Sequence, residues 1–444
     1  MKVVLKSYGC QMNFYDSEVA HGLLSHAGFE VIHEGENGIK GTKEADIVIM
    51  NTCSVREHAE ERVFGNLRIF GQQKEKNPNM IIGLMGCMVE EHREKLFQKY
   101  PQLDLMVGTR NIKELPALID EVRRTRKQVS KIKQEGISIE YTDKIKRVGT
   151  HHGWLPIMTG CDKICTYCIV PITRGAEVSM PAREVYREVS RLVDDGVKWI
   201  TLLGQNVNSY RGEEVGRPSI DFPELLNTLC QIEGLDRISF TTSHPQDATE
   251  ELFQVIAKNP KISRRFHLPL QSGSDRILRR MKRLHTFAEY ESKIERLREL
   301  VPDISITTDI IAGFSGETAE DHEATCEALR KIGYDDAFIY KYSLRPGTPA
   351  ANLEDDVPQS VKESRNQELL KIQKEKRQIA NERWLGREAM LFVSGTSPKS
   401  RDYLIGRIDQ EKRVVFSGDS SLIGNWIKIK LTELRNETFF GVLV

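Results

Sequence analysis

Three cysteines lie close together near the middle of the sequence, at Cys161, Cys165 and Cys168. They follow an apolar run at residues 154–158, and a few extended residues span only about 3.4 Å each, so the three thiols can converge on one soft metal centre. Three ligands leave one coordination position open, whereas structural zinc sites close all four positions. The spacing therefore indicates a reactive metal centre rather than a structural ion.

Three further cysteines occupy matching places in the first quarter of the chain, because Cys10, Cys53 and Cys87 each follow a short apolar run. These runs have the length of buried strands, and open α/β sheets bind ligands in the crevice beyond the carboxyl ends of their strands. A single cysteine in such a place is most often a buried packing residue. Three repeats of the same place favour a second three-cysteine metal site over that alternative.

The bulk composition limits the class of protein. A chain of 444 residues is long enough for about three domains with their own cores. Its 64 basic and 64 acidic residues give a formal net charge of +0, so any nucleic-acid surface must be a local patch. Eight cysteines, three of them crowded into one loop, fit a reducing compartment, and no stretch is apolar enough to span a membrane. We therefore expect a soluble, cytoplasmic protein that makes no membrane contact.

Residues 1–125 alternate short apolar runs with amphipathic stretches, which predicts an α/β domain with an open parallel sheet covered by helices. The expected strands are Val3–Tyr8, Ile47–Asn51, Met80–Met85 and Leu105–Val107. The expected helices include Glu18–His26 and Val89–Lys99. From residue 126 to residue 150 the pattern lapses into charged and turn residues, which indicates a linker to the next domain.

A second alternation of strands and helices runs from residue 151 to residue 370 and predicts a partial (β/α)6 barrel. Its expected strands are Trp154–Met158, Trp199–Leu203, Ile238–Thr242, Phe266–Leu270, Ser305–Ile311 and Ala337–Tyr342. Ligands of such barrels collect at the carboxyl ends of the strands. The polar residues expected at that rim, beside the Cys161 loop, include Gly204, Gln205, Ser243 and Gln271.

The chain changes character again after a connecting helical segment at residues 371–387. Residues 388–444 hold five short β-rich runs separated by glycines and charged turns, which predicts a small β-barrel. Cations and aromatic rings gather there, as they do in RNA-binding barrels, although a solvated barrel face could have the same composition. The residues of this group are Lys399, Arg401, Arg407, Lys412, Arg413, Tyr403 and Phe416.

The spacing of Cys161, Cys165 and Cys168, with Tyr167 directly before the last of them, resembles the signature of the radical S-adenosylmethionine superfamily. The segments around Cys10, Cys53 and Cys87 resemble the three motifs of the methylthiotransferase N-terminal domain. Thr173-Arg174-Gly175 is similar to part of the methylthiotransferase radical core, and residues 388–444 are similar to a TRAM domain, an RNA-binding module. The resemblance covers nearly the whole chain and implies two [4Fe-4S] clusters and S-adenosylmethionine as cofactors.

Three branches of this family differ in their substrates. Gln11-Met12-Asn13 and residues 395–402 resemble most the branch that adds a methylthio group at C2 of N6-isopentenyladenosine in tRNA. The alternatives are threonylcarbamoyladenosine in tRNA and an aspartate of ribosomal protein S12. No side-chain base can remove the C2 hydrogen as a proton. The resemblance therefore implies a radical route that uses two S-adenosylmethionine molecules, one as the source of a deoxyadenosyl radical and one as the methyl donor.

The resemblance also assigns roles to residues. Both cysteine sets would be catalytic metal ligands, Cys161, Cys165 and Cys168 for the radical cluster and Cys10, Cys53 and Cys87 for the auxiliary cluster. S-adenosylmethionine would lie at the barrel rim, with Gln205 near its amino acid portion and Asp309 near its ribose. The residues expected to bind this cofactor are Tyr167, Gly204, Gln205, Ser243, Gln271 and Asp309.

Partners follow from the same resemblance. The substrate would be a tRNA that carries an isopentenylated adenosine in its anticodon loop, expected at position 37. The reaction would also need an electron-donor protein and a sulfur source, and the chain is expected to act as a monomer.

Some alternatives stay open at this stage. The chain could be a zinc-stabilised RNA-binding protein without catalysis, in which His151 or His152 completes the Cys161 site. Ser243 and Gln271 could simply satisfy the backbone of their loops, because most side-chain hydrogen bonds go to backbone or water.

Several other residues have expected roles. His244 and His267 are expected to be core or loop histidines, and Cys230 and Cys326 to be packing residues in helices. Some residues of the densest basic stretch in the barrel are expected to contact tRNA phosphates. That stretch comprises Arg264, Arg265, Arg279, Arg280, Lys282 and Arg283.

Overall fold

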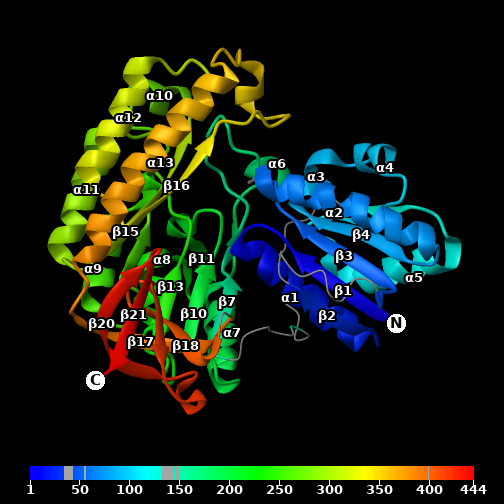
Figure 1. Cartoon of the computed structure of the whole chain (residues 1–444), viewed down its shortest axis with the longest axis horizontal. Coiled ribbons are helices and arrows are strands. Elements are labelled where there is room, and N and C mark those ends of the chain that lie inside the picture. The colour runs from blue at the N-terminus through cyan, green and yellow to red at the C-terminus, as the bar shows by residue number, and fades with distance from the viewer. Residues whose placement is uncertain (35–43, 55–56, 133–144, 146–150, 399) are drawn as a thin grey trace.

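The computed structural model describes residues 1–34, 44–54, 57–132, 145, 151–398 and 400–444. It confirms the expected α/β fold class, with an open sheet domain, a partial barrel and a small closed barrel in that order along the chain. The sheet domain lies beside the partial barrel, and the small barrel lies below it (Figure 1). No helix within the described ranges is both long enough and apolar enough to cross a membrane.

The N-terminal domain is built on a six-stranded parallel sheet of order β2-β1-β3-β4-β5-β6. Its strands are β1 Lys2–Ser7, β2 Glu30–Glu34, β3 Ile47–Thr52, β4 Ile81–Gly86, β5 Leu105–Val107 and β6 Val129–Lys131. Helices α1 Gln11–His26 and α5 Leu115–Thr125 cover one face, and α2 Glu57–Lys76, α3 Cys87–His92 and α4 Lys95–Lys99 cover the other. Strands β1, β3 and β4 are buried on both faces, which explains their continuous apolar runs.

Two edge strands of this sheet were not anticipated from the sequence. Strand β2 carries charged residues at both ends, and β6 lies inside the stretch that the sequence marks as a linker. Each pairs with a single neighbour, β1 and β5 respectively, and has too few apolar residues to form a recognisable run. Most of the rest of the expected linker lies outside the described residues.

The central domain contains six parallel strands in two sheets, β13-β10-β7 and β14-β15-β16, with a parallel bridge from Ile238 to Ile262 between them. The strands are β7 His152–Pro156, β10 Trp199–Leu203, β13 Arg237–Phe240, β14 Arg265–His267, β15 Ser305–Ala312 and β16 Asp336–Lys341. The outer helices are α7 Ala182–Asp194, α8 Phe222–Leu229, α9 Glu250–Lys258, α11 Phe287–Leu300 and α12 Ala319–Ile332. Within the described ranges β7 and β16 do not pair with each other, so the barrel is open on one side.

Smaller elements decorate the barrel rim and surface. They are β8 Met158–Thr159, α6 Val170–Thr173, β9 Val178–Ser179, β11 Arg211–Glu214, β12 Arg217–Asp221 and α10 Asp275–Arg280. Strands β8 and β9 pair with each other on either side of the Cys161 loop, so this loop starts and ends at one place on the rim.

Alternate residues of the barrel strands face different surroundings. Leu155, Ile200 and Phe240 pack outward against the helices in the largest apolar core. Trp154 and Thr201, one residue away from these, line a cavity inside the barrel. The interior of this barrel is therefore polar and partly hollow, unlike a barrel whose interior is filled by apolar layers.

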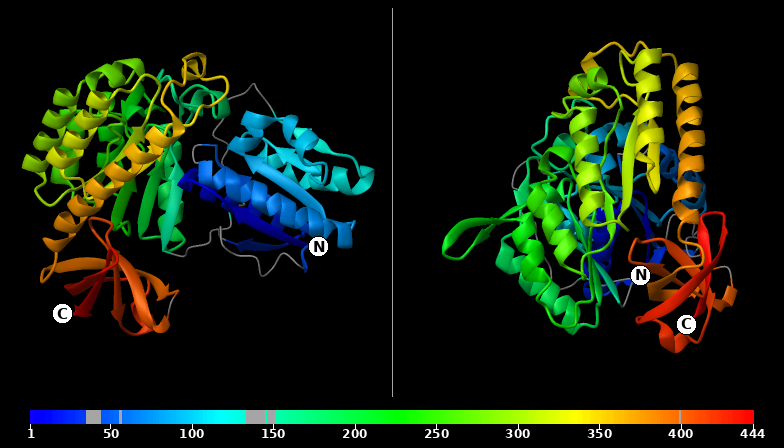
Figure 2. Two further views of the ribbon diagram at one scale, coloured as in Figure 1. Left: turned by 45° about the horizontal axis from the view of Figure 1, so that its top comes forward. Right: turned by 90° about the vertical axis from the view of Figure 1, so that its left-hand side faces the viewer.

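Helix α13 Gln359–Glu382 runs along the barrel and leads to the C-terminal domain (Figure 2). That domain is a closed barrel of order β17-β18-β19-β21-β20. Its strands are β17 Glu388–Ser397, β18 Ser400–Ile408, β19 Arg413–Ser417, β20 Trp426–Arg435 and β21 Thr438–Leu443. Its core contains Leu391, Val393, Phe416 and Phe439.

The C-terminal barrel docks against the amino ends of the central strands through charged groups. Asp409 accepts a hydrogen bond from Arg237, whose guanidinium also lies 4.7 Å from the ring centroid of Trp426. Glu411 accepts hydrogen bonds from Ser239 at 2.7 Å and Ser263 at 3.0 Å. The two domains are therefore joined by a partly buried ion pair and hydrogen bonds, as well as by aromatic contact between Trp199 and Phe392.

This docking corrects part of the expected RNA-binding patch. Lys412 donates to Asp335 at 2.9 Å and to Asn381 at 2.8 Å, and Phe416 is buried in the domain core. Arg407 donates to the backbone carbonyl of Glu411 and lines the interdomain cavity. Lys399 lies outside the described residues, while Tyr403 is exposed and stays a candidate for stacking on RNA. A count of cations overestimated this patch because sequence does not show which charges face another domain.

We predict that Glu411→Gln weakens this docking. Burial opposes ionisation of Glu411, but the charges of Arg265 and Arg407 and the two serine hydrogen bonds lower its pKa overall. Its contribution is therefore present above the ordinary glutamate pKa of about 4.3 and is lost as the pH falls through the lowered value. At pH 7 the substitution should reduce the free energy of unfolding by about 2–3 kcal/mol, measured by urea denaturation.

The matched control is Glu433→Gln, because Glu433 is exposed and pairs with Arg435 inside the same strand. Its effect on the free energy of unfolding should be much smaller than that of Glu411→Gln, because solvent screens exposed ion pairs. Equal effects of the two substitutions would show that the Glu411 contacts do not stabilise the interface.

Candidate functional site

Cys10, Cys53 and Cys87, here the N-terminal cysteine set, meet at one edge of the parallel sheet. Each follows one of the adjacent strands β1, β3 and β4, whose ends are in register because Ser7 pairs with Asn51 and Thr52 with Gly86. A Cβ atom placed on Gly9 would lie only 2.2 Å from the Cβ of Cys53, so the first two turns touch. The structure thus brings together the three thiols that the sequence grouped by strand-end position.

Two asparagines hold these turns together. Asn13 donates to the side chain of Asn51 at 3.0 Å and to the carbonyl of Thr52 at 2.9 Å, and Asn51 donates back to the carbonyl of Asn13 at 2.6 Å. Asn13 also accepts a hydrogen bond from the Cys10 thiol at 3.1 Å. Sequence reasoning did not give these asparagines a role, although each stands within three residues of a cysteine.

Cys161, Cys165 and Cys168, here the barrel cysteine set, lie in a loop at the carboxyl ends of the barrel strands. Gly160 has φ +76°, and its backbone N–H donates to the side chain of Gln205 at 2.6 Å. The N–H of Cys161 donates to the carbonyl of Gly175 at 3.1 Å, and that of Cys168 to the carbonyl of Cys165 at 3.1 Å. The loop is therefore fixed both within itself and to the rim of β10.

A buried arginine faces the barrel cysteine set. Arg283 is 4% exposed and donates to the Cys165 sulfur at 3.5 Å and to the carbonyl of Pro269 at 2.7 Å. Arg283 is therefore not one of the residues of the basic stretch that can contact tRNA phosphates, because a guanidinium buried this deeply cannot reach the surface. Arg265 is also engaged inside the chain, with Glu411 at 3.3 Å, whereas Arg279 and Lys282 are exposed and stay candidates.

The thiols of the two sets differ in their electrostatic surroundings. Burial raises the pKa of Cys161 to about 11 and that of Cys168 to about 12. A hydrogen bond with Cys53 outweighs burial and, with the charge of Arg174, lowers the pKa of Cys10 to about 6. Burial raises the pKa of Cys87 despite the neighbouring Arg174. Metal binding has to displace the protons of the barrel thiols, and a buried cation beside each set favours the resulting thiolates.

Arg174 connects the two cysteine sets. It belongs to the barrel loop but extends into the N-terminal domain, where it is 7% exposed and donates to Asp16 at 2.9 Å. The charge of Cys87 and that of Asp16 keep the pKa of Arg174 well above its ordinary value despite burial. The next residue, Gly175, accepts the hydrogen bond from Cys161. The segment at residues 173–175 thus contacts both cysteine sets, whereas the sequence identified it only as part of a motif.

Other contacts fix the two domains around this segment. Thr109 donates to the carbonyl of Thr173 at 3.2 Å, and Arg345 pairs with Glu60 at 2.9 Å. The rings of Phe14 and Trp154 lie 5.9 Å apart, centroid to centroid. The edge of the sheet that carries the N-terminal cysteine set therefore faces the open side of the barrel.

Of the expected cofactor-binding residues, Gly204, Ser243 and Gln271 follow the carboxyl ends of β10, β13 and β14, and Asp309 lies within β15. The hydroxyl of Ser243 donates to Asn208 at 3.0 Å, so this side chain does not serve its own loop backbone. Gln271 adopts φ +74° and bonds through its backbone to Asp309 and Ile311, and the Asp309 carboxylate lies 3.4 Å from His267. A Cβ atom on Gly204 would lie 2.4 Å from Met158. The binding of S-adenosylmethionine by these residues stays a prediction.

Polar atoms without a partner gather near the same rim. Within the described ranges, Oδ1 of Asn206, Nδ2 of Asn208, Nε2 of His244 and Nε of Arg283 are buried and make no hydrogen bond. Buried polar atoms are normally satisfied, so a group of such atoms beside a three-cysteine loop fits a polar ligand. Sequence reasoning missed the two asparagines and Arg283, and a strand-end position was the only available signal for the asparagines.

Neither candidate zinc histidine approaches the barrel cysteine set. His152 lies at the amino end of β7, whereas the cysteine loop follows its carboxyl end. His152 bonds to Thr201 at 2.8 Å and packs edge-on against two tryptophans, and burial lowers its pKa to about 4. His151 contacts the carbonyl of Gly196. The zinc alternative therefore lacks its fourth ligand.

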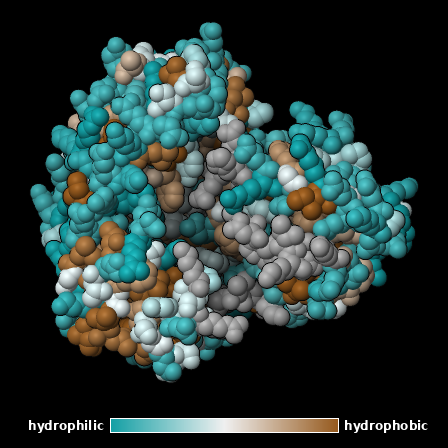
Figure 3. Space-filling view, in the orientation of Figure 1, coloured by the Kyte–Doolittle hydropathy of each residue, from teal (hydrophilic) through white to brown (hydrophobic). Residues whose placement is uncertain are grey.

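A cavity of about 620 Å³ lies inside the barrel near the amino ends of its strands, beside the C-terminal barrel. Its wall includes Gln11 of the N-terminal domain, Trp154 and Phe338 on the two edge strands, and Phe392 of the C-terminal barrel. All three domains thus contribute to one space. Figure 3 shows the surface hollowed between the barrel and the N-terminal domain.

Family models match three parts of the chain. The radical SAM superfamily matches residues 155–329, a family described as uncharacterized protein family UPF0004 matches residues 2–108, and the TRAM domain matches residues 383–444. The first match contains the barrel cysteine set and the second contains the N-terminal cysteine set.

Full-length relatives share one description. A protein of Carboxydothermus hydrogenoformans is 41% identical over 440 residues, covering 99% of this chain and 98% of its own, and a protein of Francisella tularensis subsp. novicida is 40% identical over 446 residues, covering 100% and 99%. Both are named tRNA-2-methylthio-N(6)-dimethylallyladenosine synthase. Among solved structures, the radical S-adenosylmethionine methyltransferase TsrM of Kitasatospora setae matches with a TM-score of 0.57 at 16% identity, covering 79% of this chain and 74% of TsrM. The last match supports the fold alone.

We predict that Gly160→Ala removes metal from the barrel set only. Alanine disfavours φ +76°, and its Cβ would lie 1.8 Å from the carbonyl oxygen of Ala176. After anaerobic reconstitution the variant should keep roughly half of the iron of the wild type, measured as iron per chain, because the N-terminal set is unaffected.

Gly196→Ala is the control, because Gly196 has φ +92° but a Cβ atom placed on it would meet open space. It shares the backbone strain without the clash and should keep all the iron. An unchanged iron content in Gly160→Ala would mean that the turn does not position the cysteines.

Proposed function

Because this chain belongs to the tRNA-2-methylthio-N(6)-dimethylallyladenosine synthase family of radical S-adenosylmethionine enzymes, we propose that it inserts a methylthio group at C2 of N6-isopentenyladenosine in tRNA. Dimethylallyl and isopentenyl are two names for the same substituent. The expected target is adenosine 37 in the anticodon loop.

One observation carries the proposal. Two sets of three cysteines, each beside a buried arginine, are connected by a single segment, residues 173–175. Sulfur insertion at a C–H bond needs both a means of removing the hydrogen and a place to hold the sulfur. Two separate three-thiol sites meet both needs, whereas a simple methyltransferase needs neither.

The donor sets fit the cofactors of the family, two [4Fe-4S] clusters and S-adenosylmethionine. Three thiols and a buried cation at each site suit a cluster with one open iron. These cofactors, when bound, supply the one-electron chemistry that side chains cannot provide. Cys161, Cys165 and Cys168 would hold the radical cluster and Cys10, Cys53 and Cys87 the auxiliary cluster.

The remaining residues of the site bind and orient. Arg283 and Arg174 offset the negative charge of the thiolates and hold their loops in place. Asn206, Asn208 and His244 present unsatisfied polar atoms near Gln205 and Ser243, where the amino acid and ribose portions of S-adenosylmethionine would find partners. Tyr167, Gly204, Gln271 and Asp309 complete the proposed cofactor pocket.

The cavity suits a nucleobase that has left its stack. Bases of a single-stranded loop can splay out and stack on aromatic side chains, which lets an enzyme reach their ring atoms. Trp154 and Phe338 stand on the two edge strands of the opening and offer such faces. The C-terminal barrel below the cavity would hold the surrounding RNA through its remaining exposed residues, Tyr403 among them.

The proposed reaction also requires partners. An electron-donor protein would reduce the radical cluster, and a sulfur source would restore the sulfur used in each turnover. We propose that the chain works as a monomer in the cytoplasm, where tRNA is available.

Nucleoside mass spectrometry of tRNA tests the proposed substrate. A strain that lacks this gene should contain N6-isopentenyladenosine without its 2-methylthio form, and the gene on a plasmid should restore that form. Loss of 2-methylthio-threonylcarbamoyladenosine instead would assign the chain to another branch. Unaltered tRNA nucleosides would reject both tRNA substrates.

We predict that Arg174→Gln shifts the reduction potential of the auxiliary cluster to more negative values. A nearby cation stabilises the reduced, more negative cluster, so its removal should lower the potential by roughly 50–100 mV, equivalent to about 1–2 kcal/mol for one electron. Redox titration followed by electron paramagnetic resonance, in protein that also lacks the barrel cysteines, measures this shift.

Arg345→Gln is the matched control. Arg345 also crosses between the two domains, but it pairs with Glu60. This variant should leave the potential within about 20 mV of the wild type. Arg174, but not Arg345, is among the charges that act on the thiols of Cys10 and Cys87. Equal shifts in both variants would attribute the effect to loosened domain contact instead of to the charge of Arg174.

A further inference from the structure

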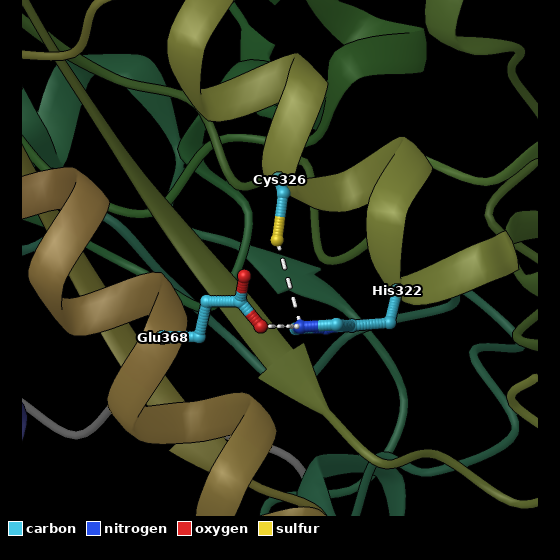
Figure 4. Close-up of side chains that lie close together, drawn as sticks. All are labelled: His322, Cys326 and Glu368. Carbon is cyan, nitrogen blue, oxygen red and sulfur yellow. Dashed lines mark hydrogen bonds and ion pairs between the residues drawn. The ribbon is translucent and has the colours of Figure 1, made fainter. Parts of the chain in front are cut away.

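Three metal-ligating side chains meet far from the cysteine sets, between helices α12 and α13. His322 and Cys326 stand one helical turn apart on α12 and so share a face, and Glu368 reaches them from α13 (Figure 4). Nε2 of His322 lies 3.5 Å from the Cys326 sulfur and 3.0 Å from a carboxylate oxygen of Glu368. None of these residues belongs to the site described above.

Hydrogen bonding alone accounts poorly for this trio. Both contacts converge on the same nitrogen, which either donates or accepts but cannot do both. If Nε2–H donates to Glu368, the thiol proton of Cys326 cannot be accepted by that nitrogen. If the thiol donates to Nε2, the contact with Glu368 has no proton unless the carboxyl group carries one.

The spacing of the three atoms fits a tetrahedral metal ion. With Zn–S near 2.3 Å and Zn–N near 2.0 Å, the tetrahedral angle places sulfur and nitrogen about 3.5 Å apart. Nitrogen and carboxylate oxygen on such an ion lie about 3.3 Å apart. The observed separations of 3.5 Å and 3.0 Å are close to these edges, so small side-chain rotations suffice to bind the ion.

We propose that His322, Cys326 and Glu368 form a zinc-binding site that links α13 to α12 of the barrel. Cysteine sulfur, imidazole nitrogen and carboxylate oxygen are the usual zinc ligands. Cys326 is fully buried and the Glu368 side chain is 50% exposed, so the ion would enter from the solvent side and keep a water as its fourth ligand. Binding replaces the thiol proton of Cys326 with a Zn–S bond and releases that proton to solvent.

The proposed zinc site lies where it would affect the attachment of the C-terminal barrel. Glu368 directly precedes Leu369, which is buried against the barrel, and α13 continues from there to the C-terminal barrel. Because zinc binding releases the thiol proton of Cys326, affinity should rise with pH. The zinc site would stabilise the attachment of the C-terminal barrel without taking part in the chemistry at the cysteine sets.

Metal analysis of full-length, reconstituted protein tests the proposal. After equilibrium dialysis against Zn²⁺, the wild type should hold about one zinc per chain in addition to its iron. Cys326→Ser should lose that zinc at unchanged iron content. Cys230→Ser is the matched control, because Cys230 is a buried cysteine at the end of α8 and no cluster of metal-ligating groups includes it among the described residues. It should keep the zinc.

Cobalt provides an independent readout. Co²⁺ in this site should show a thiolate-to-metal absorption band that is absent in Cys326→Ser. Glu368→Gln, at a half-exposed position that tolerates substitution, should keep the band but weaken Co²⁺ binding by at least about tenfold. Equal zinc in the wild type and Cys326→Ser, or an equal loss in Cys230→Ser, would overturn the proposal. So would unchanged Co²⁺ affinity in Glu368→Gln, which would leave the trio as a hydrogen-bonded cluster.

Discussion

The buried ion pair between Arg174 and Asp16 is the interaction on which the geometry of the site depends. It carries a guanidinium from the barrel loop into the N-terminal domain and places it beside the N-terminal cysteine set. A buried cation that lost its partners would cost several kcal/mol, so the two domains are strongly constrained to this arrangement. The same loop holds Cys161 through Gly175, and the separation of the two cysteine sets is thereby fixed by a few residues.

The polar interior of the barrel suits a site that has to admit a nucleobase. A barrel filled with apolar layers would leave no room for a nucleobase, whereas this barrel keeps threonines, a histidine and aromatic rings inside and packs aliphatic residues outward against its helices. Because packed side chains do not fill its interior, the barrel needs stabilising contacts from another domain. The C-terminal barrel closes the lower end through Arg237, Asp409 and Glu411, so the domain assigned to RNA also forms part of the cavity wall.

Sequence patterns could predict the strands and the grouping of cysteines, because apolar runs and strand-end positions are local features. Edge strands β2 and β6 escaped prediction, since their few apolar residues form no recognisable run. The roles of Arg174 and Arg283 escaped for a different reason. A sequence shows that a residue is charged but not what that charge faces, so Arg283 looked like a surface cation and proved to be buried beside Cys165. Lys412 was misjudged in the same way.

The division of labour between the two cysteine sets is tested most directly by 5′-deoxyadenosine release in two triple variants. One replaces Cys10, Cys53 and Cys87 by alanine and the other replaces Cys161, Cys165 and Cys168, and each should retain about four irons. We expect the first variant to release 5′-deoxyadenosine from S-adenosylmethionine while leaving tRNA without a methylthio group, and the second to release none. Release by the second variant, or its loss in the first despite retained iron, would contradict the assignment of radical formation to the barrel set.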